Sequence, residues 1–262
     1  MRIGFIGCGK MGGAILRGIL GKVFLKEDIS VYELNPSVIT SLKRDGIDVV
    51  SSIDGLLDKV DIVLIAIKPQ DFSGLLNSLK GKVDGKLIIT IAAGVKIQTI
   101  ENALGSVKVA RAMPNTAATL GAASSVLCFN SLLLGSDKKV AEDIFNAIGK
   151  VVLIDEGLMD DVIPIGGSFT AFEYYFYKGF LESSLKRGVP FDVAKKLLVQ
   201  SIIGSAKMIE NDDRDINELI SDVCSKGGTT LAGLSAFEEG NLLKIVADCA
   251  TRCAEGSKEL GK

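Results

Sequence analysis

Apolar and polar positions divide the chain into two parts with different periodicities. Up to about residue 155, short apolar runs alternate with segments of helical period, a pattern typical of parallel strands that are covered on both faces. The run at 61–67 is the clearest, because apolar residues fill it almost without a break. Beyond residue 155 such runs stop and long helical patterns take over. We therefore predict a Rossmann-type, doubly wound α/β domain over 1–155 and an all-helical domain over 156–262.

The same pattern places the individual elements. In the first part, strands are expected at 1–7, 29–33, 46–50, 61–67, 86–91 and 107–110. Pro36 suits the first turn of a helix that runs to Leu42. In the second part, helices are expected at 160–187, 190–210, 216–224, 230–239 and 242–260. The first of these carries aromatic residues at helical spacing, a stripe typical of a core or a subunit interface: Phe169, Phe172, Tyr175, Phe176 and Phe180.

Three glycines follow the first predicted strand with the spacing of a dinucleotide-binding turn. Gly7 permits the sharp turn, Gly9 lets the backbone approach a diphosphate, and Gly12 lets the next helix lie close to the strand. Free N–H groups and the positive end of the helix dipole would then face the diphosphate. Glu33 closes the next strand, where a carboxylate can accept from both ribose hydroxyls. Together these features favour a dinucleotide site over an ordinary glycine turn.

Two further strand ends fall at the edge of the sheet where ligands bind in open α/β folds. The fourth strand is followed by Lys68-Pro69-Gln70 and the fifth by Ala92-Ala93-Gly94, whose small side chains leave room for a flat ring. A polar turn over 111–116 reaches the same edge. Within it, Asn115 is either an ordinary turn residue or the holder of a carboxamide, and composition favours neither interpretation.

Composition narrows the classes of function. The formal net charge is −2, which provides no broad basic surface for nucleic acid. Mean hydropathy is positive, yet charge or glycine interrupts every apolar run before it reaches membrane-spanning length. The surplus of apolar residues is therefore expected in a core and in a subunit interface. The first residues form a strand and lack the pattern of a signal peptide, so we expect a cytoplasmic enzyme.

The reactive side chains are limited in kind. The chain has no histidine, which excludes His-dependent triads and most catalytic zinc sites. Its five cysteines are odd in number and scattered, as is typical of reduced thiols. Cys249 and Cys253 are one helical turn apart and are interpreted as small buried residues, with metal binding as the minor alternative. We expect no metal site.

The most polar segment of the helical half, at 222–231, joins the end of one predicted helix to the start of the next. Gly227 and Gly228 free its backbone, and Thr229 or Thr230 can cap the following helix. One interpretation is a plain helix connector with a good cap, which spacing alone slightly favours. The other is an anion-binding nest, in which successive N–H groups and hydroxyls hold a small carboxylate.

Six motifs spread over the chain carry a family resemblance. They are Ile3-Gly-Phe-Ile-Gly-Cys-Gly-Lys-Met-Gly12, Ala66-Ile-Lys-Pro69, Ile91-Ala-Ala-Gly-Val95, Arg111-Ala-Met-Pro-Asn-Thr116, Gly204-Ser-Ala-Lys-Met208 and Ser225-Lys-Gly-Gly-Thr-Thr230. In order and spacing they resemble the Δ1-pyrroline-5-carboxylate reductases, over essentially the whole chain. The first motif also resembles the β-hydroxyacid dehydrogenases.

The resemblance to these reductases implies a reaction and an assembly. The reaction is reduction of 1-pyrroline-5-carboxylate to L-proline by hydride from NAD(P)H, the last step of proline biosynthesis. A cyclic imine is basic enough to arrive protonated, so hydride transfer needs mostly positioning and no histidine. The implied assembly is an interlocked helical dimer, from which larger rings are built.

The resemblance also implies roles for individual residues. The backbone at Gly227, Gly228, Thr229 and Thr230 would hold the substrate carboxylate. The Thr230 hydroxyl would bond the ring nitrogen and relay a proton. Glu156 matches a substrate-contacting acid, and its alternative interpretation is a helix-start carboxylate favoured by the dipole. The expected coenzyme contacts are Ile6, Gly7, Cys8, Gly9, Lys10, Met11, Gly12, Glu33, Asn35, Ala66, Ile67, Lys68, Pro69, Ala92, Ala93 and Asn115.

The choice of coenzyme follows from the charge around Glu33. Its carboxylate can accept from a 2′-hydroxyl and would repel a 2′-phosphate, and residues 34–37 contain no lysine or arginine to hold one. We therefore expect NADH to be preferred over NADPH.

Two departures from the family pattern leave alternatives open. Lys226 stands where the family usually has proline, and Phe169 stands where it usually has glycine. The substrate is therefore either pyrroline-5-carboxylate or another cyclic imine. A β-hydroxyacid dehydrogenase would need a lysine acid/base, for which Lys178 is the nearest candidate. The remaining alternative is a weakly catalytic paralogue with a regulatory role.

Overall fold

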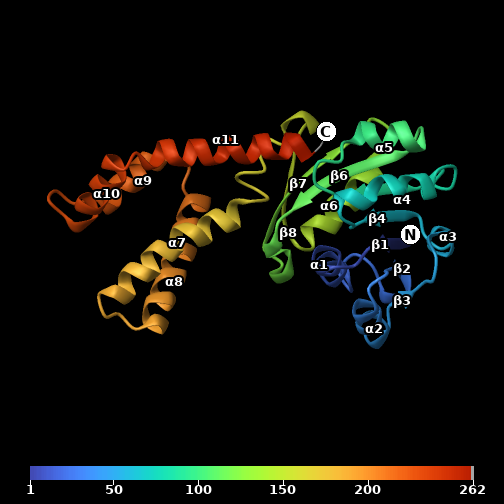
Figure 1. Ribbon diagram of the computed structural model, residues 1–262, viewed down its shortest axis with the longest axis horizontal. Helices are drawn as coiled ribbons and strands as arrows, with labels where there is room; N and C mark the ends of the chain where they lie inside the picture. Colours follow the sequence, from blue (N-terminus) through green and yellow to red (C-terminus); the bar gives the residue numbers. More distant parts are fainter. Residues whose placement is uncertain (261–262) are drawn as a thin grey trace. The chain divides into compact units, whose positions relative to one another are not determined.

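A computed structural model describes residues 1–260, which contacts group into two compact units (Figure 1). The sheet unit comprises Met1–Ser168 and the part of the last helix, α11 (Leu242–Leu260), that starts at Arg252. The helical unit comprises Phe169–Thr251. The units join at Ser168 and at Thr251, whereas the predicted boundary at 155 rests on the change of pattern and stays a prediction.

The sheet unit is built on an eight-stranded sheet in the order β3-β2-β1-β4-β5-β6-β7-β8. Its strands are β1 (Ile3–Ile6), β2 (Ile29–Tyr32), β3 (Asp48–Val49), β4 (Ile62–Ile65), β5 (Leu87–Thr90), β6 (Lys108–Pro114), β7 (Ala123–Phe129) and β8 (Gly149–Leu153). The first six are parallel, which confirms the predicted doubly wound fold. β1 and β4 pair with each other, and the strand order reverses between them. This is the switch point of the sheet, beside which such folds bind ligands.

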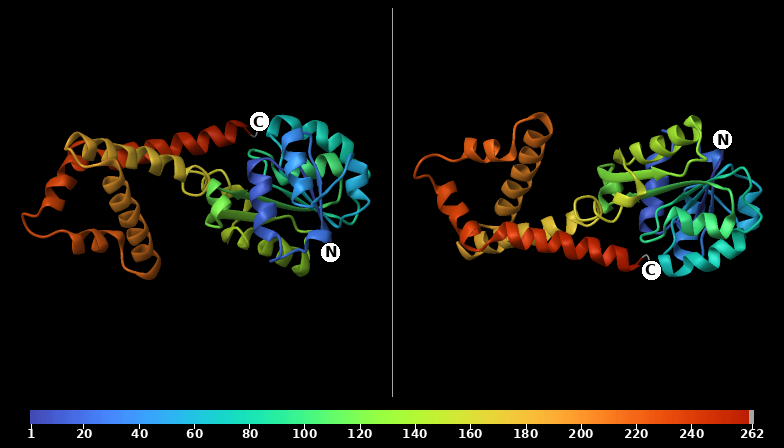
Figure 2. Two further views of the ribbon diagram at one scale, coloured as in Figure 1. Left: turned by 90° about the horizontal axis from the view of Figure 1, so that it is seen from below. Right: turned by 90° about the horizontal axis from the view of Figure 1, so that it is seen from above.

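Helices cover both faces of this sheet, as the two views of Figure 2 show. The face of α1 (Lys10–Ile19), α2 (Pro36–Arg44) and α6 (Gly135–Asn146) shares one apolar core with Phe5 and Leu64. The face of α3 (Ile53–Leu57), α4 (Phe72–Leu79) and α5 (Ile97–Leu104) shares the other with Ile6 and Ile65. Successive strand residues thus enter opposite cores, which explains why β4 is apolar throughout. Short 3₁₀ turns include η1 (Lys26–Asp28), η2 (Pro69–Asp71) and η4 (Glu156–Leu158).

The sheet departs from prediction at one edge. β7, which was not predicted, runs antiparallel to β6. The chain passes directly from β6 through the short helix η3 (Thr116–Leu120), without the crossover helix that a parallel connection needs. β7 contains Ser124 and Ser125, and β8 has exposed residues. Each strand has an apolar run, at 126–129 and at 151–154, but neither run was among the predicted strands.

The helical unit contains the predicted helices with one corrected start. They are α7 (Phe169–Lys186), α8 (Phe191–Asn211), α9 (Ile216–Val223), α10 (Thr229–Glu239) and the first part of α11. The helix predicted from residue 160 begins only at Phe169, because Pro164 lacks an N–H group and Gly166 and Gly167 are poor helix formers. Within residues 1–260, no helix is long and apolar enough to cross a membrane.

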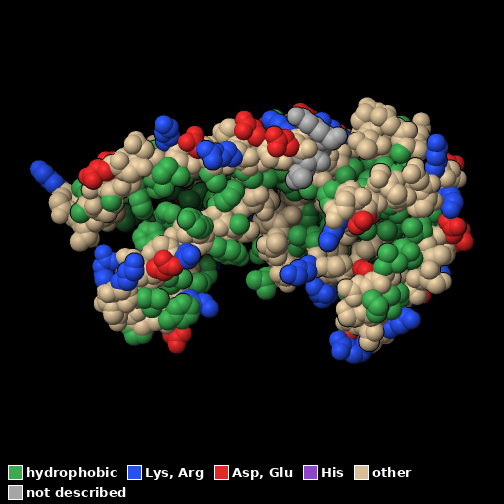
Figure 3. All heavy atoms as spheres, in the orientation of Figure 1, with side chains coloured by type: hydrophobic (Ala, Val, Ile, Leu, Met, Phe, Trp, Pro, Cys, Tyr) green, Lys and Arg blue, Asp and Glu red, His purple; other side chains and the backbone are tan. Residues whose placement is uncertain are grey.

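The helical unit buries little of its apolar surface within one chain. Among its apolar residues, only Ala194 and Leu219 count as buried within the described part. Tyr175 and Leu243 are 81% and 85% exposed, and Figure 3 shows apolar side chains gathered over this unit. The predicted aromatic stripe packs partly on α10, since the ring of Phe176 lies 5.9 Å from that of Phe237. The rest of this surface needs cover from a second chain.

The end of α11 belongs to the sheet unit through two polar contacts. The buried Ser257 hydroxyl donates to Oδ1 of Asp160, and Lys258 pairs with Asp161 at 2.7 Å. The pKa of Lys258 is raised, chiefly by its hydrogen bond to Asp161.

Candidate functional site

The turn between β1 and α1 has the geometry that a dinucleotide site needs. Gly7 has φ +83°, and a Cβ added there would lie 2.8 Å from the Ala66 carbonyl oxygen. A Cβ on Gly12 would lie 2.8 Å from the Gly7 carbonyl oxygen and 3.0 Å from the Ala66 Cβ. An added Cβ on Gly9 would meet nothing within 4 Å. Gly7 and Gly12 therefore pack the turn tightly, and Gly9 leaves its outer side open.

The start of α1 is suited to an anion. Its N-cap is Gly9, which gives no side-chain cap, and its first turn contains no acidic residue. The first N–H groups of a helix lack intrahelical partners and carry the positive end of the dipole. This helix start therefore fits a diphosphate.

Glu33 joins the end of β2 to this turn. Its Oε2 accepts from the Cys8 N–H at 2.6 Å, and its Oε1 accepts from the N–H groups of Leu34 and Asn35, each at 2.8 Å. The carboxylate is thereby held against the glycine turn. Asn35 itself caps α2, because its Oδ1 accepts from the Ser37 N–H at 3.0 Å.

A groove of about 450 Å³ lies between α1 and α2 beside Glu33. Its lining includes Lys10 and Arg17 from α1 and Asn35 and Ser37 from α2. Lys10 is among the expected coenzyme contacts, whereas Arg17 was missed, because cations were sought only in residues 34–37. Their spacing of seven residues, two turns on one face of a helix, was the available signal.

Cys8 lies inside the predicted coenzyme turn but does not offer a reactive thiol. Burial raises its pKa to about 12, and the charge of Glu33 adds to the rise while Arg17 opposes it. The thiol therefore stays protonated at neutral pH and acts as a small packed side chain. In residues 1–260, no group of three or more Cys, Asp or Glu side chains is placed to hold a metal ion.

The ends of β4 and β5 continue the same carboxyl edge. Ala66 and Ile67 are half-buried, while Lys68 and Pro69 are exposed directly after β4. β4 pairs with both β1 and β5, so these residues and the loop that begins after Thr90 follow neighbouring strands. In that loop Ala92 is buried and Ala93 is exposed. The structure thus brings the expected coenzyme contacts from Ile6 to Ala93 to one edge.

Asn115 is buried, and its side chain makes one contact within its own turn and one with a distant segment. Its Nδ2 donates to the Gly166 carbonyl at 3.1 Å, and its Oδ1 accepts from the Ala117 N–H at 3.2 Å. The contact with Ala117 is the one that the turn interpretation expects, and contact with a carboxamide stays a prediction.

Glu156 is tied to two other elements of the sheet unit. Its Oε1 accepts from the Ile97 N–H at 2.8 Å and from Arg111 Nη1 at 3.0 Å. The helix whose start it serves is α5 and not the long helix that follows it in sequence. Arg111, which the sequence argument did not single out, is a buried partner of this carboxylate. Contact between Glu156 and a substrate stays a prediction.

The corner at 225–230 is a tight turn followed directly by α10. The Gly228 N–H donates to the Ser225 carbonyl at 2.8 Å, and Gly227 has φ +71°. This is the position where a type II turn requires glycine, and Lys226 stands where such a turn favours proline. The N-cap of α10 is Gly228, without a side-chain cap, so the expectation that Thr229 or Thr230 caps this helix is wrong. Its free N–H groups instead suit a small anion.

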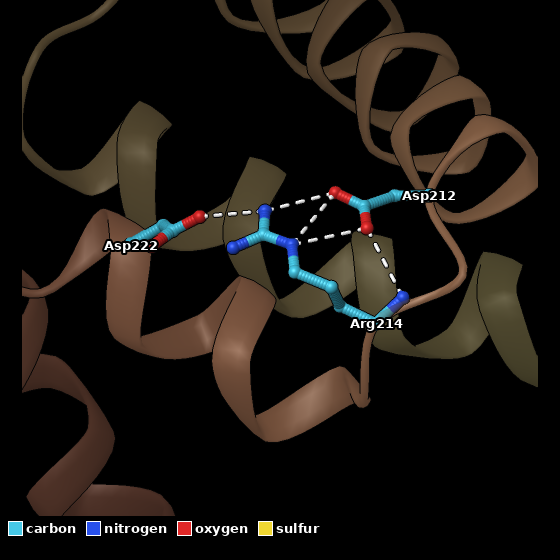
Figure 4. A network of polar contacts seen from close by, with 3 residues as sticks. All are labelled: Asp212, Arg214 and Asp222. Atoms are coloured by element: carbon cyan, nitrogen blue, oxygen red, sulfur yellow. Dashed lines mark hydrogen bonds and ion pairs between the residues drawn. The ribbon is translucent and has the colours of Figure 1, made fainter.

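An exposed ion-pair network holds the segment between α8 and α9. Arg214 Nη2 lies 2.8 Å from Asp212 Oδ2 and 2.9 Å from Asp222 Oδ2 (Figure 4). Its hydrogen bonds lower the pKa of Asp212. The network joins the linker to α9, the helix that leads into the 225–230 corner. Because the groups are exposed, it contributes more to local geometry than to stability.

Lys178 does not resemble a buried acid/base. Its side chain is 65% exposed and pairs with Glu182 on α7 at 3.7 Å. Nothing in the described contacts of Lys178 therefore favours a β-hydroxyacid dehydrogenase.

Comparisons with known proteins point to one family along the whole chain. The family model described as pyrroline-5-carboxylate reductase dimerisation matches residues 156–260, and the one described as NADP oxidoreductase, coenzyme F420-dependent, matches residues 2–94. Pyrroline-5-carboxylate reductases of Methanosarcina acetivorans and Escherichia coli are 35% and 33% identical to this chain, over 100% of it and 98% of their own lengths. A crystal structure of Plasmodium falciparum pyrroline carboxylate reductase with NADP bound has 30% identity and a TM-score of 0.92, and covers 100% of this chain and 98% of that one.

Proposed function

This chain belongs to the pyrroline-5-carboxylate reductase family, and on that premise we propose that it reduces 1-pyrroline-5-carboxylate to L-proline at the end of proline biosynthesis. Its coenzyme is a nicotinamide dinucleotide, which supplies the hydride when bound. The observation that best supports the proposal is the glycine turn closed by Gly7 and Gly12 and open at Gly9, with the positive start of α1 beside Glu33. The predicted cytoplasmic location stays a prediction, which cell fractionation checks.

The protein residues have modest chemistry to perform. The imine arrives protonated, so its carbon is already electrophilic and the protein mainly orients it. We assign the substrate carboxylate to the N–H groups at the start of α10, around Gly228 and Thr229, whose helix dipole favours an anion. The Thr230 hydroxyl, on the second residue of that helix, is assigned to the ring nitrogen, where it holds or passes a proton.

Thr230→Ala tests this assignment. We expect kcat/KM for pyrroline-5-carboxylate to fall about a hundredfold, the typical loss for one hydrogen-bonding group that acts on the reacting atoms. Nicotinamide absorbance in a steady-state assay measures the loss.

Thr230→Ser is the matched control, since it keeps the hydroxyl and is expected to retain activity within about fivefold. An alanine variant as active as the wild type would refute the role of Thr230. A wild-type protein that turns over other cyclic imines better than pyrroline-5-carboxylate would correct the substrate, and one that turns over none would favour the regulatory paralogue.

We further propose that the coenzyme preferred is NADH. The Glu33 carboxylate lies against the glycine turn, where it suits a 2′-hydroxyl and opposes a 2′-phosphate. Lys10 and Arg17 line the neighbouring groove and act in the opposite direction, because cations there favour the 2′-phosphate of NADPH.

Glu33→Gln tests how far the Glu33 carboxylate determines the preference for NADH over NADPH. We expect kcat/KM with NADH to fall about tenfold, because ribose acceptors are lost and the Cys8 N–H loses its carboxylate partner. With NADPH the fall should stay below about threefold, since removal of the charge offsets the loss.

Asp45→Asn is the control, because Asp45 lines the same groove but lies directly after α2, and it should leave the ratio of kcat/KM for NADH and NADPH unchanged. A wild type that prefers NADPH, and loses that preference in Lys10→Ala or Arg17→Ala, would show that the cations and not Glu33 decide.

The chain also self-associates through its helical unit, which matches a dimerisation domain and exposes its apolar side chains. The state we propose is a dimer, and assembly of dimers into larger rings stays a prediction.

A further inference from the structure

Glu156 holds two elements of the sheet unit together at one oxygen atom. It is the first residue of η4, and its Oε1 accepts from both Ile97 and Arg111. The Arg111 side chain is only 6% exposed, against 30% for Glu156. The carboxylate is therefore the counter-ion of a buried guanidinium and, at the same time, an acceptor for the start of α5.

α5 depends on this distant acceptor. Its N-cap, Lys96, makes no side-chain cap, and its first turn contains no acidic residue. The first N–H groups of a helix need acceptors and favour a negative charge nearby. Glu156, which is 59 residues further along the chain, provides both the acceptor and the negative charge. Loss of its charge would thus loosen the first turn of α5.

The loop from 91 to 96, which enters this turn, is anchored at both ends. At its start, the fully buried Thr90 accepts through Oγ1 from the Ala92 N–H at 3.1 Å. At its end, Glu156 holds Ile97. Thr90 pairs in register with Arg111 on β6, and Arg111 is the residue that pairs with Glu156.

We propose that Glu156 is a positioning residue for this loop and, through it, for the coenzyme. The inference rests on the proposed function and on the expected contact of Ala92 and Ala93 with the dinucleotide. It differs from the role that the family resemblance implies, a direct contact with substrate. The two roles are separable, because positioning changes coenzyme affinity and a substrate contact changes KM for the imine.

Glu156→Gln is the first test. It removes the charge and keeps one acceptor oxygen, and we expect Kd for the reduced coenzyme to rise about fivefold. KM for pyrroline-5-carboxylate at saturating coenzyme should stay within about twofold. Fluorescence titration of the reduced nicotinamide gives Kd without turnover. Glu101→Gln is the matched control on the same helix. Glu101 accepts a hydrogen bond of 2.8 Å from Asn130 and does not contact the loop, so the Kd of this variant for the reduced coenzyme should not change.

Rescue provides the second test. Lys96→Ser gives α5 a local cap, because serine is favoured at the N-cap and lysine is not. Added to Glu156→Gln, it should bring Kd back to within about twofold of the wild type. A substrate contact would not be rescued in this way. If Glu156→Gln does not fold, Glu156→Asp with and without Lys96→Ser provides the same comparison with the charge retained.

Two outcomes would overturn the inference. One is a raised KM for the imine with coenzyme Kd unchanged, and the other is a raised Kd that Lys96→Ser does not correct. A wild type that binds the coenzyme but does not reduce the imine would refute the proposed function alone, because Kd is measured without the reaction.

Discussion

Gly12→Ala is expected to lower kcat/KM for the coenzyme about a hundredfold, the cost of a misplacement of about 1 Å at a binding element. The added methyl would lie 2.8 Å from the Gly7 carbonyl oxygen and 3.0 Å from the Ala66 Cβ. The first neighbour is backbone and the second is fixed to a strand end, so α1 has to move outward. The helix start that fits the diphosphate would move with it. Steady-state kinetics with varied coenzyme measures the loss.

Gly13→Ala is the control at the next position of the same helix. A methyl there would meet the end of the Arg17 side chain at 3.2 Å, which can swing away, and the Cys8 carbonyl oxygen at 3.4 Å. Activity should remain within about threefold, and the gain in helix propensity should offset part of any strain. Equal losses in both variants would show that close packing of α1 on β1 does not govern coenzyme binding.

The double variant Tyr175→Asp and Leu243→Asp is expected to convert the dimer to a monomer. These two side chains are among the most exposed in the helical unit. Burying a large apolar side chain stabilises by about 1.5–3 kcal/mol. A two-fold dimer loses each side chain twice, which amounts to about 6 kcal/mol or more and weakens association at least about ten-thousandfold.

Light scattering after size exclusion measures the mass of the variant. Lys244→Asp, which changes charge beside Leu243 on another side of α11, should remain dimeric. A double variant that keeps the dimer mass would place the interface away from Tyr175 and Leu243.

The sequence sufficed for the parts of the fold in which local pattern and tertiary role agree. β1, β4 and β5 are buried along their whole length, so their continuous apolar runs were visible. The turn from Gly7 to Gly12 was visible because backbone conformation and close approach both demand glycine there. β8 is the edge strand and is partly exposed, and the apolar run of β7 follows Ser124 and Ser125, so neither strand was predicted.

Contacts between segments that are distant in the chain could not be predicted from the sequence. Glu156 precedes a helical pattern, which suggested a role at the start of that helix, but its carboxylate serves α5 and Arg111. Lys10 and Arg17 enter the groove beside Glu33 only because α1 and α2 pack on the same face of the sheet. The first long helix was predicted to begin at residue 160 because its apolar pattern extends that far, but Pro164, Gly166 and Gly167 interrupt the helix before Phe169.

The last helix gives the chain an unusual sensitivity at its C-terminal end. The helical unit is an insertion with two covalent joins, since the chain leaves the sheet unit at Ser168 and returns to it at Arg252. Ser257 and Lys258 then bond to Asp160 and Asp161. Shortening the chain before these residues would therefore not trim a dispensable tail. The helical unit, now attached to the sheet unit at both of its ends, would then be attached only at Ser168. Asp160 and Asp161 would lose these partners.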